Sequence, residues 1–454
     1  MMHLTRRDFV SNVAATGAAF TLPSRLFAQE ADDARLTLSA PLTHSDWMLK
    51  PNIPSGVEGV RHMLNACKAC GWSHVYWRVF DAGRSTYASK LLKPAGAADV
   101  DNYFNPQNDA DRALFRRYSP AVDEKRAAEI LQQLEANGYT NFDSLATAID
   151  YGHSIGLKIH AWASINEDDH GWGWASEFAK AHPEYRWVRR DGRPYRSQLS
   201  FAFPEVRQYK LALIKELLAY DIDGLFLDWI RTGDVRDNPQ TDSAGVADNG
   251  YEQPNIDAFK RQFGVDPHEV PNDDDRWVSL RAEPQTLFMR DLRALIDIAK
   301  STPLRTGRLS DQSTPGTRAD STKPTRNIPI AVMVGHPHHY RGLLDPIDGN
   351  LRGLFLDVPT WAKERLMDAA IPAGYYRAGG SAATAYRALA KETGGSVDLW
   401  YYAWVPQTVD EFNGQFSEAQ SLGAKRMLFW EADYIDDRPN GAALQLVMSS
   451  KAKW

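Results

Sequence analysis

The sequence predicts an α/β fold, specifically a (β/α)8 TIM barrel with long insertions in the loops that follow its strands. Short apolar runs rich in β-branched and aromatic residues alternate with longer segments of helical period, which indicates repeated βα units. The chain has 454 residues, a length that a barrel with long loops occupies as one domain. Several of the apolar runs end in polar side chains, as strands do at the mouth of such a barrel.

The first 28 residues have the features of an export signal. The chain opens with MMHLTRRDFVSNVAATGAAF, in which Arg6 and Arg7 precede a weakly apolar, Ala-rich stretch. This pattern is typical of a twin-arginine signal, and Ala28 supplies the small residue expected at a cleavage point. We therefore expect residues 1–28 to be a signal peptide, residues 29–454 to form a single barrel domain, and the mature protein to be periplasmic or secreted.

Composition and charge limit the classes of partner. The formal net charge is −6, which makes nucleic acid an improbable partner. No segment after the signal reaches the roughly 18 consecutive apolar residues that a membrane span needs. The two cysteines, Cys67 and Cys70, have the i, i+3 spacing of one helix face and no further ligands nearby, so packing is favoured over a zinc or redox role. We expect no cofactor.

The N-terminal half contains four predicted strands. Helix 142–156 has clear start and stop signals, with Asp143 or Asn141 as its N-cap and Gly156 at its end. The segment YRWVRR is the weakest of the strands, and a hairpin within a loop is an equal alternative for it. The strands are predicted at 73–80, 157–165, 185–190 and 223–230, with further helices at 56–70 and 205–220.

The C-terminal half contains the other four strands. A helix at 285–300 precedes residues 301–327, which are rich in Ser, Thr, Pro and Gly and almost devoid of large apolar residues. We predict a disordered loop there, on the N-terminal face of the barrel because it joins a helix to a strand. Two long segments that follow strands, 81–140 and 231–284, are expected to rim the mouth. The remaining strands are predicted at 328–335, 367–376, 396–404 and 425–432.

Polar and aromatic residues are expected to converge at the mouth, because the carboxyl ends of parallel strands meet there. Aromatic faces pack on the C–H faces of sugar rings, while carboxylates and cationic donors bind the hydroxyl groups. This mixture of residues therefore favours a carbohydrate substrate. The candidates for substrate binding are His160, Trp162, Trp229, Arg231, His336, Tyr375, Tyr376, Trp404 and Trp430.

Asp228 is the main catalytic candidate. It ends the apolar run GLFL, and a buried carboxyl group must be satisfied or used. Glycoside hydrolysis commonly needs two carboxyl groups, one that protonates the leaving oxygen and one that attacks the anomeric carbon or activates water. Asp228 fits the second role, with a structural bond to Arg231 as the alternative. For the acid we prefer Glu431, whose neighbour Trp430 would raise its pKa by desolvation, over Glu167 in the polar NEDDH loop.

Two alternative readings concern metals. The loop at 166–169 carries oxygen ligands of the kind that calcium accepts, but it lacks the EF-hand spacing, and a solvated acidic loop explains it equally well. His336 and His338 have His-x-His spacing. They follow the fifth predicted strand, however, whereas barrel metallohydrolases usually carry this pair on the first. We therefore expect no metal in the catalytic centre.

A set of motifs in collinear order resembles a known family. The segments FDSLATAIDYGHSIGLKIHAW, PEVRQYKLALIKELLAYDIDGLFLDWIR, YEQPNIDAFKRQFGVDP and DVPTWAKERLMDAAIPAGYY resemble the glycosyl-hydrolase-like family 10 barrels, exported bacterial proteins related to the wider α-amylase-like group. The resemblance covers roughly residues 140–435. It includes an Asp-Gly-x-x-x-Asp-x-x-Arg pattern, matched by Asp223, Gly224, Asp228 and Arg231, and it implies that Asp228 is catalytic.

The chain departs from the family pattern at two places. Ser200, Phe201, Ala202 and Phe203 stand before PEVR, where the family often has Asn or Asp with Pro, and the fifth strand ends in GHPHH without a Glu. The leading hypothesis is an exported glycoside hydrolase that acts on a poly- or oligosaccharide. The alternative is a carbohydrate-binding barrel without catalytic activity.

Overall fold

The computed structural model describes residues 36–42, 56–81, 83–94, 142–166, 168, 175–228, 230, 245–300, 326–335, 337–342, 354–372, 382–430 and 441–452, with a few single positions between 109 and 132. The expected signal at 1–28 lies outside these ranges, as do residues 301–325 of the predicted disordered loop and most of the 81–140 insertion. These three expectations stay predictions.

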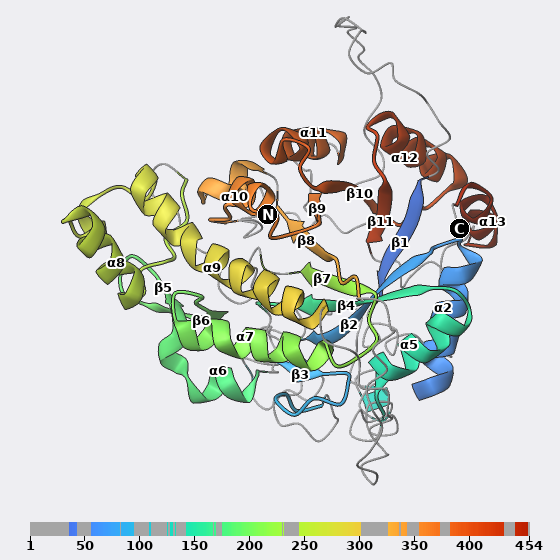
Figure 1. The fold of residues 1–454 in the computed structure, drawn as a ribbon, viewed down its shortest axis with the longest axis horizontal. Coiled ribbons are helices and arrows are strands. Elements are labelled where there is room, and N and C mark those ends of the chain that lie inside the picture. Colours follow the sequence, from blue (N-terminus) through green and yellow to red (C-terminus); the bar gives the residue numbers. More distant parts are fainter. Residues whose placement is uncertain are drawn as a thin grey trace, which may run out of the picture. The chain divides into compact units, whose positions relative to one another are not determined.

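Eight parallel strands form a closed barrel (Figure 1). Each strand pairs in parallel with the next one around the barrel, and β1 pairs with both β2 and β11, which closes the ring. The strands are β1 (Thr37–Leu42), β2 (His74–Asp81), β4 (Lys158–Ser164), β7 (Gly224–Asp228), β8 (Ile330–Val334), β9 (Ala369–Pro372), β10 (Asp398–Trp404) and β11 (Arg426–Trp430). The predicted (β/α)8 barrel is confirmed.

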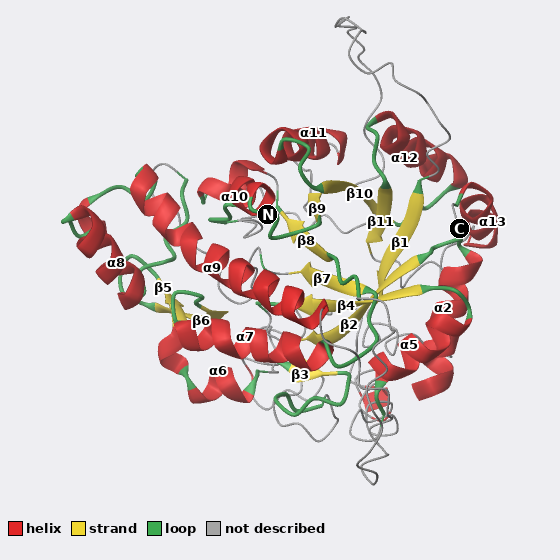
Figure 2. Cartoon of the chain, in the orientation of Figure 1, coloured by secondary structure: helices red, strands yellow, loops and turns green. Residues whose placement is uncertain are grey.

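Helices join most of these strands and surround them (Figure 2). The longer ones are α2 (Gly56–Ala69), α5 (Ser144–Ser154), α7 (Pro204–Leu217), α8 (Gln253–Phe263), α9 (Asp275–Lys300), α11 (Ala382–Thr393), α12 (Val409–Ser421) and α13 (Gly441–Lys451), and the shorter ones are α6 (Glu177–Ala181) and α10 (Val358–Lys363). The side chain of Asp143 accepts a hydrogen bond from the amide of Ala146 and caps α5, as predicted. No helix in the described part of the chain is long and apolar enough to cross a membrane.

Two strand predictions were wrong. The first barrel strand is β1, which the sequence reading missed because TLSAPL mixes small, polar and proline residues with only two leucines. The segment predicted as the third strand contains β5 (Arg186–Val188), which pairs antiparallel with β6 (Pro194–Leu199) in a separate two-stranded sheet. The turn passes through Gly192, whose positive φ of 84° suits a glycine. The alternative, a hairpin within a loop, is therefore confirmed.

The helix predicted at 285–300 is longer than expected. α9 begins at Asp275 and continues through Pro284, which lies inside the helix and is buried. Proline usually ends or kinks a helix, but here the helix continues on both sides of it. Arg326 comes directly after residues 301–325. Its guanidinium donates to the carbonyls of Leu218 and Tyr220, 2.9 and 2.6 Å away, and so ties the chain to the end of α7.

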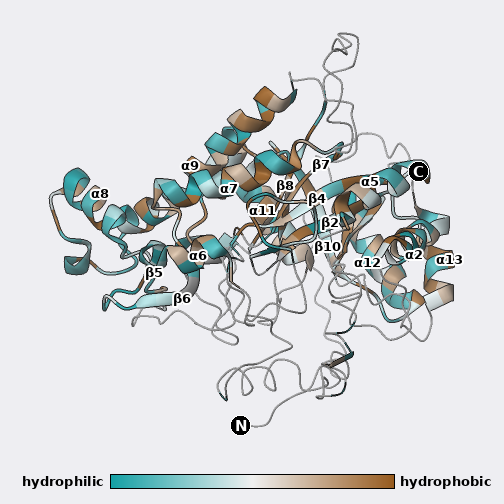
Figure 3. Ribbon diagram, turned by 90° about the horizontal axis from the view of Figure 1, so that it is seen from below, coloured by the Kyte–Doolittle hydropathy of each residue, from teal (hydrophilic) through white to brown (hydrophobic). Residues whose placement is uncertain are grey.

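The strands separate the two main layers of the barrel core, and smaller hydrophobic clusters lie elsewhere in the described part of the chain. The larger layer lies between the barrel and its helices and includes both cysteines, which are buried, as the packing interpretation predicts. α9 carries hydrophobic and hydrophilic residues along its length (Figure 3), as expected of a helix with one face on this layer. The second layer fills the barrel interior and is built around Tyr76, Trp162, Phe226, Met333, Trp400 and Tyr402.

Candidate active site at the carboxyl ends of the strands

The carboxyl ends of the barrel strands meet at one end of the barrel and define its mouth. The register places Ser164, the last residue of β4, opposite Asp228, the last residue of β7. In the same way Trp404 of β10 lies opposite Trp430 of β11. Because all these strands run parallel, the four residues lie at the same end of the barrel. Asp228, Trp404 and Trp430 were predicted to be in the mouth from the sequence.

Asp228 faces the barrel interior. Successive side chains alternate between the two faces of a strand, so Asp228 shares its face with Phe226, which packs in the interior layer. The side chain of Asp228 is fully buried, with an exposed fraction of 0%, and its main-chain oxygen accepts a hydrogen bond from the amide of Ile165 at 2.9 Å. Local hydrophobic pattern and strand geometry thus bring a carboxyl group to the base of the mouth.

Aromatic rings from β4, β10 and β11 contact one another in the barrel interior. The rings of Trp162 and Trp430 meet edge to face with their centroids 5.4 Å apart, and Tyr402 contacts both Trp404 and Trp430. Trp162 is buried, whereas Trp404 and Trp430 are only partly buried. The indole N–H of Trp162 has no hydrogen-bond acceptor among the described residues. The two partly exposed rings have the surface that packing against a sugar ring requires.

Arg78 is a residue of this region that the sequence reading missed. It lies on β2, opposite Trp162 in the register, and its guanidinium carbon is 4.9 Å from the centroid of the Trp162 ring. Such a distance allows a cation–π interaction. Strand alternation in HVYWRVFD places Arg78 on the same face as Tyr76, which packs in the barrel interior. A positively charged residue at an inward-facing strand position was therefore the signal that the sequence offered.

His160 lies at the opposite end of the barrel from Asp228. It pairs with Gly224, the first residue of β7, while Asp228 is the last. The ring of His160 contacts those of His74 and Tyr76, and burial, reinforced by the positive charge of Arg426, holds its pKa well below the usual value. The structure therefore does not bring this predicted substrate-binding residue next to the mouth.

The first two residues of the Asp-Gly-x-x-x-Asp pattern have a structural role. A Cβ atom at Gly224 would lie 2.3 Å from the Nδ1 of His160, so only glycine fits there without rearrangement. Asp223 accepts hydrogen bonds from His153 and from the amide of Ile159, each at 2.8 Å. Burial alone would raise the pKa of Asp223, but these hydrogen bonds and one from Lys158 outweigh it and lower the pKa to about 2.

The acidic loop after β4 is closed by a buried ion pair. The carboxylate of Asp168 accepts from the ammonium of Lys210 on α7 and from the hydroxyl of Ser176, and Lys210 and Asp168 are both buried. The solvated-loop reading is therefore wrong for Asp168, and a cation there would have to displace Lys210. Burial lowers the pKa of Lys210, an effect that the charge of Asp168 opposes. Within the described ranges, no group of three or more His, Cys, Asp or Glu residues is arranged to hold a metal ion.

The other predicted site residues lie outside the described part of the chain. All of them follow the carboxyl end of a barrel strand in the sequence, and their roles stay predictions. They are Glu167, Trp229, Arg231, His336, Tyr375, Tyr376 and Glu431.

Comparison of the sequence with known families gives a match over most of the barrel. The profile of the Glycosyl hydrolase-like 10 family matches residues 103–398, well over half of the chain. The chain belongs to the Glycosyl hydrolase-like 10 family. This confirms the resemblance drawn from the motifs, and the matched region contains β4, β7, β8 and β9 with Asp228 among them. No curated protein sequence matches this family member.

Solved structures share the fold of this Glycosyl hydrolase-like 10 protein at low sequence identity. The glycoside hydrolase domain of PgaB (BpsB) from Bordetella bronchiseptica is 14% identical, with a TM-score of 0.51 over 91% of this chain and 98% of that one. The catalytic domain of β-amylase from Paenibacillus polymyxa is 9% identical, with a TM-score of 0.51 over 93% and 99%. Together with the family, the shared barrel supports a glycoside hydrolase-type function.

A third similar structure is longer than this family member. α-L-fucosidase isoenzyme 2 from Paenibacillus thiaminolyticus is 12% identical and has a TM-score of 0.49. The match covers 92% of this chain, which spans only 49% of the length of the fucosidase.

Proposed function

We propose that the protein is an exported glycoside hydrolase that cleaves glycosidic bonds of a poly- or oligosaccharide with a pair of carboxyl groups. The observation that carries this proposal is the buried carboxyl group of Asp228 at the end of the barrel where the partly exposed rings of Trp404 and Trp430 also lie. Membership of the Glycosyl hydrolase-like 10 family supports the reaction class. The glycoside hydrolase domain of PgaB (BpsB) and the catalytic domain of β-amylase share the barrel fold, which agrees with it.

In this proposal, Asp228 attacks the anomeric carbon or activates the attacking water. Glu431, or alternatively Glu167, donates the proton to the leaving oxygen. Each acid candidate follows a barrel strand directly or within a few residues, so both are in the part of the sequence that rims the mouth. A separation of about 5 Å between the two carboxyl groups would indicate retention of configuration, and 6.5–9.5 Å would indicate inversion.

The predicted substrate contacts come from the aromatic rings at the mouth and the loops around it. Trp404 and Trp430 would pack on sugar rings, and Arg78 joins them as a cationic donor from β2. Of the residues predicted from the sequence, Trp229, Arg231, His336, Tyr375 and Tyr376 keep their proposed role as contacts.

A reducing-end assay of the chain without residues 1–28, on a panel of α- and β-linked polysaccharides, tests the proposal. We expect the wild type to release reducing ends from at least one substrate. Asp228→Asn should lower turnover by at least 10³-fold, while the melting temperature stays nearly unchanged, because the two side chains have the same size. Glu431→Gln and Glu167→Gln are assayed beside it. The residue whose substitution removes activity on substrates with poor leaving groups is the acid.

Activity of Asp228→Asn equal to that of the wild type would refute the role of Asp228. If no substrate is cleaved but a polysaccharide retards the protein in an affinity gel, the second candidate applies, a carbohydrate-binding barrel without catalysis. The partly exposed Trp404 and Trp430 favour sugar binding under either function. Export is tested separately by replacing Arg6 and Arg7 with lysine, which should stop twin-arginine transport in a bacterial reporter fusion.

A further inference from the structure

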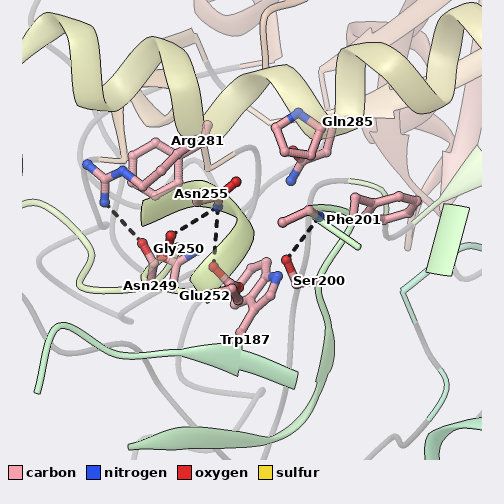
Figure 4. Close-up of a pocket in the computed structure, with 12 residues that line it drawn as sticks. Trp187, Ser200, Phe201, Asn249, Gly250, Glu252, Asn255, Arg281 and Gln285 are labelled. Carbon is pink, nitrogen blue, oxygen red and sulfur yellow. Dashed lines mark hydrogen bonds between the residues drawn. The ribbon is translucent and has the colours of Figure 1, made fainter. Parts of the chain in front are cut away.

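A pocket away from the strand ends of the barrel lies in a lobe that two inserted segments form. The hairpin β5–β6 follows β4, and residues 245–252 with α8 follow β7, so both segments leave the barrel at its carboxyl side. They pack against the N-terminal half of α9 (Figure 4). The residues that line the pocket are Trp187, Ser200, Phe201, Ala202, Asn249, Gly250, Glu252, Asn255, Arg281, Pro284, Gln285 and Phe355.

Two buried acceptor oxygens line this pocket. Glu252 is 1% exposed, and its Oε2 accepts from the side-chain amide of Asn255 at 3.3 Å, while its Oε1 has no donor among the described residues. Gln285 reaches the pocket from α9, and its Oε1 likewise has no donor there. Burying such oxygens is costly unless a hydrogen bond compensates for the lost water. A hydroxyl group inside the pocket has one donor hydrogen and would satisfy one of them.

The size and charge of the pocket limit the group that it accepts. Its free volume is about 10 Å³, the room of about one water molecule or one hydroxyl group. Arg281 brings a positive charge to the wall, and its guanidinium is already held by the carbonyls of Ala247 and Asn249 at 3.0 and 3.1 Å. Because the wall already carries the positive charge of Arg281, a neutral donor suits the pocket better than a second cation.

Aromatic side chains that are themselves buried enclose the pocket. Trp187 and Phe201 line the pocket on the side of the hairpin, and Phe355 lies under the guanidinium of Arg281, with the guanidinium carbon 3.8 Å from its ring centroid. A hydroxyl group presents one water-sized donor. Such a donor matches the size of the pocket and one of its two acceptor oxygens.

We propose that this pocket is a second carbohydrate subsite, separate from the barrel mouth, which binds one saccharide hydroxyl group between Glu252 and Gln285. The choice of a saccharide rests on the proposed function. The hydroxyl group enters the pocket and donates to one of the two oxygens, while the ring that carries it stays outside, because the pocket has room for one hydroxyl group only. The lobe thereby holds part of a substrate chain at a distance from the bond that is cleaved.

The ionisation of Glu252 gives this subsite a pH dependence. Burial raises the pKa of Glu252 to about 7, against which hydrogen bonds from Ser200 and main-chain amides act only partly. Arg281, the other charged residue that lines the pocket, stays protonated throughout this range. A carboxylate is the stronger acceptor, so sugar binding at this pocket should tighten as pH rises from 6 to 8.

The indole N–H signal of Trp187, followed by NMR, tests the proposal in the full chain. The probes are the methyl α- and β-glycosides of glucose, galactose, mannose and N-acetylglucosamine, and Trp187→Phe assigns the signal. We expect at least one glycoside to shift the Trp187 signal in the wild type and in Asp228→Asn. The affinity read from this signal should fall about ten-fold or more in Gln285→Leu, which removes one acceptor.

Gln253→Leu is the matched control, because the same change at the exposed start of α8 should leave the affinity unchanged. Glu252→Gln keeps the shape of the side chain and should abolish the difference between pH 6 and pH 8, which provides a readout if Gln285→Leu fails to fold. A Trp187 signal that no glycoside shifts would overturn the proposal and leave the pocket as a site for water.

The outcomes separate this inference from the proposed function. Shifts of the Trp404 and Trp430 signals without a shift of Trp187, together with cleavage, would refute the subsite and keep the hydrolase. A Trp187 shift that depends on Gln285, in a protein that cleaves no substrate, would keep the subsite and refute the hydrolase.

Discussion

Asp223 and Asp228 lie five residues apart on either side of one short strand and have different surroundings. Asp223, at the amino end of β7, is bound by His153 and Lys158 and by the amide of Ile159. Asp228, at the carboxyl end, is fully buried in the interior of the barrel beside the mouth. The family pattern contains both residues, but the geometry separates Asp223, which holds neighbouring segments together, from Asp228, which lies at the carboxyl end of the strand.

We expect Asp223→Asn to destabilise the protein without changing the mouth. The pKa of Asp223 is about 2 in the folded protein and 3.8 when unperturbed, so its stabilisation is present above pH 3.8 and disappears as pH falls through 2. The variant should lose about 2 kcal/mol of unfolding free energy at pH 7. Urea denaturation at pH 7 and pH 3 measures this, and an equal loss at both values would contradict the assignment.

At the scale of elements, contacts between inserted loops and helices fix the surroundings of the site. The pair of Lys210 and Asp168 joins α7 to the loop after β4, and the amide of Ser176 donates to the main-chain oxygen of Asp168 at 2.6 Å. Gly83 lies against the same loop, where a Cβ atom would be 2.2 Å from the nitrogen of Ser176. The loop that carries the acid candidate Glu167 is thus anchored at the next residue, Asp168.

Lys210→Met should therefore be strongly destabilising. It leaves the carboxylate of Asp168 buried without its cation, which typically costs 3–5 kcal/mol, roughly half of the stability of a domain. Lys215→Met, the same change at an exposed position of α7, is the control and should cost less than about 0.5 kcal/mol. Thermal denaturation compares them, and recovery of stability in the double variant with Asp168→Asn would confirm the pairing.

The approach of β7 to β4 gives a second prediction at this scale. Gly224→Ala places a methyl group 2.3 Å from the Nδ1 of His160. The shifts needed to remove this close contact should lower the free energy of unfolding by about 1–3 kcal/mol. Gly414→Ala, in the interior of α12 with no atom near the added methyl group, should instead stabilise the protein by about 0.4–1 kcal/mol. Equal effects of the two substitutions on urea denaturation would show that packing at β7 is loose.

At the scale of the whole molecule, a polar cluster closes the amino end of the barrel interior. Arg426 of β11 donates to the hydroxyl of Tyr76 and contacts the Nε2 of His74, each at 2.9 Å, and so connects strands that are distant in the sequence. Burial, and then the charge of Arg426, lower the pKa of His74 to about 3. Both His74 and His160 are therefore neutral in the folded barrel near neutral pH.

This cluster should make the protein sensitive to acid. The unperturbed pKa of His74 is 6.5, so the unfolded chain takes up protons below that pH and the folded chain does not. Stability should then fall as pH decreases from 6.5 towards 3, by roughly 2 kcal/mol at pH 5 from His74 alone. His74→Gln should flatten this dependence in urea denaturation, whereas His62→Gln, at an exposed position of α2, should preserve it.

The sequence by itself determined the class of fold, seven of the eight barrel strands and the position of Asp228. These features depend on local hydrophobic runs, on helix caps such as Asp143, and on the rule that parallel strands end together. It also predicted the aromatic residues Trp404 and Trp430 at the mouth, because each ends or nearly ends an apolar strand.

Only the tertiary structure decided what depends on register and on contacts between distant segments. β1 was missed because its pairing with β2 and β11 leaves no pattern in its own six residues. His160 was predicted in the site because a position within a strand does not show at which end of the barrel the side chain lies. Only its pairing with Gly224 in the folded structure shows this. The pocket around Glu252 requires the hairpin, α8 and α9 to pack together, since burial and unsatisfied oxygens arise only when separate segments exclude water jointly.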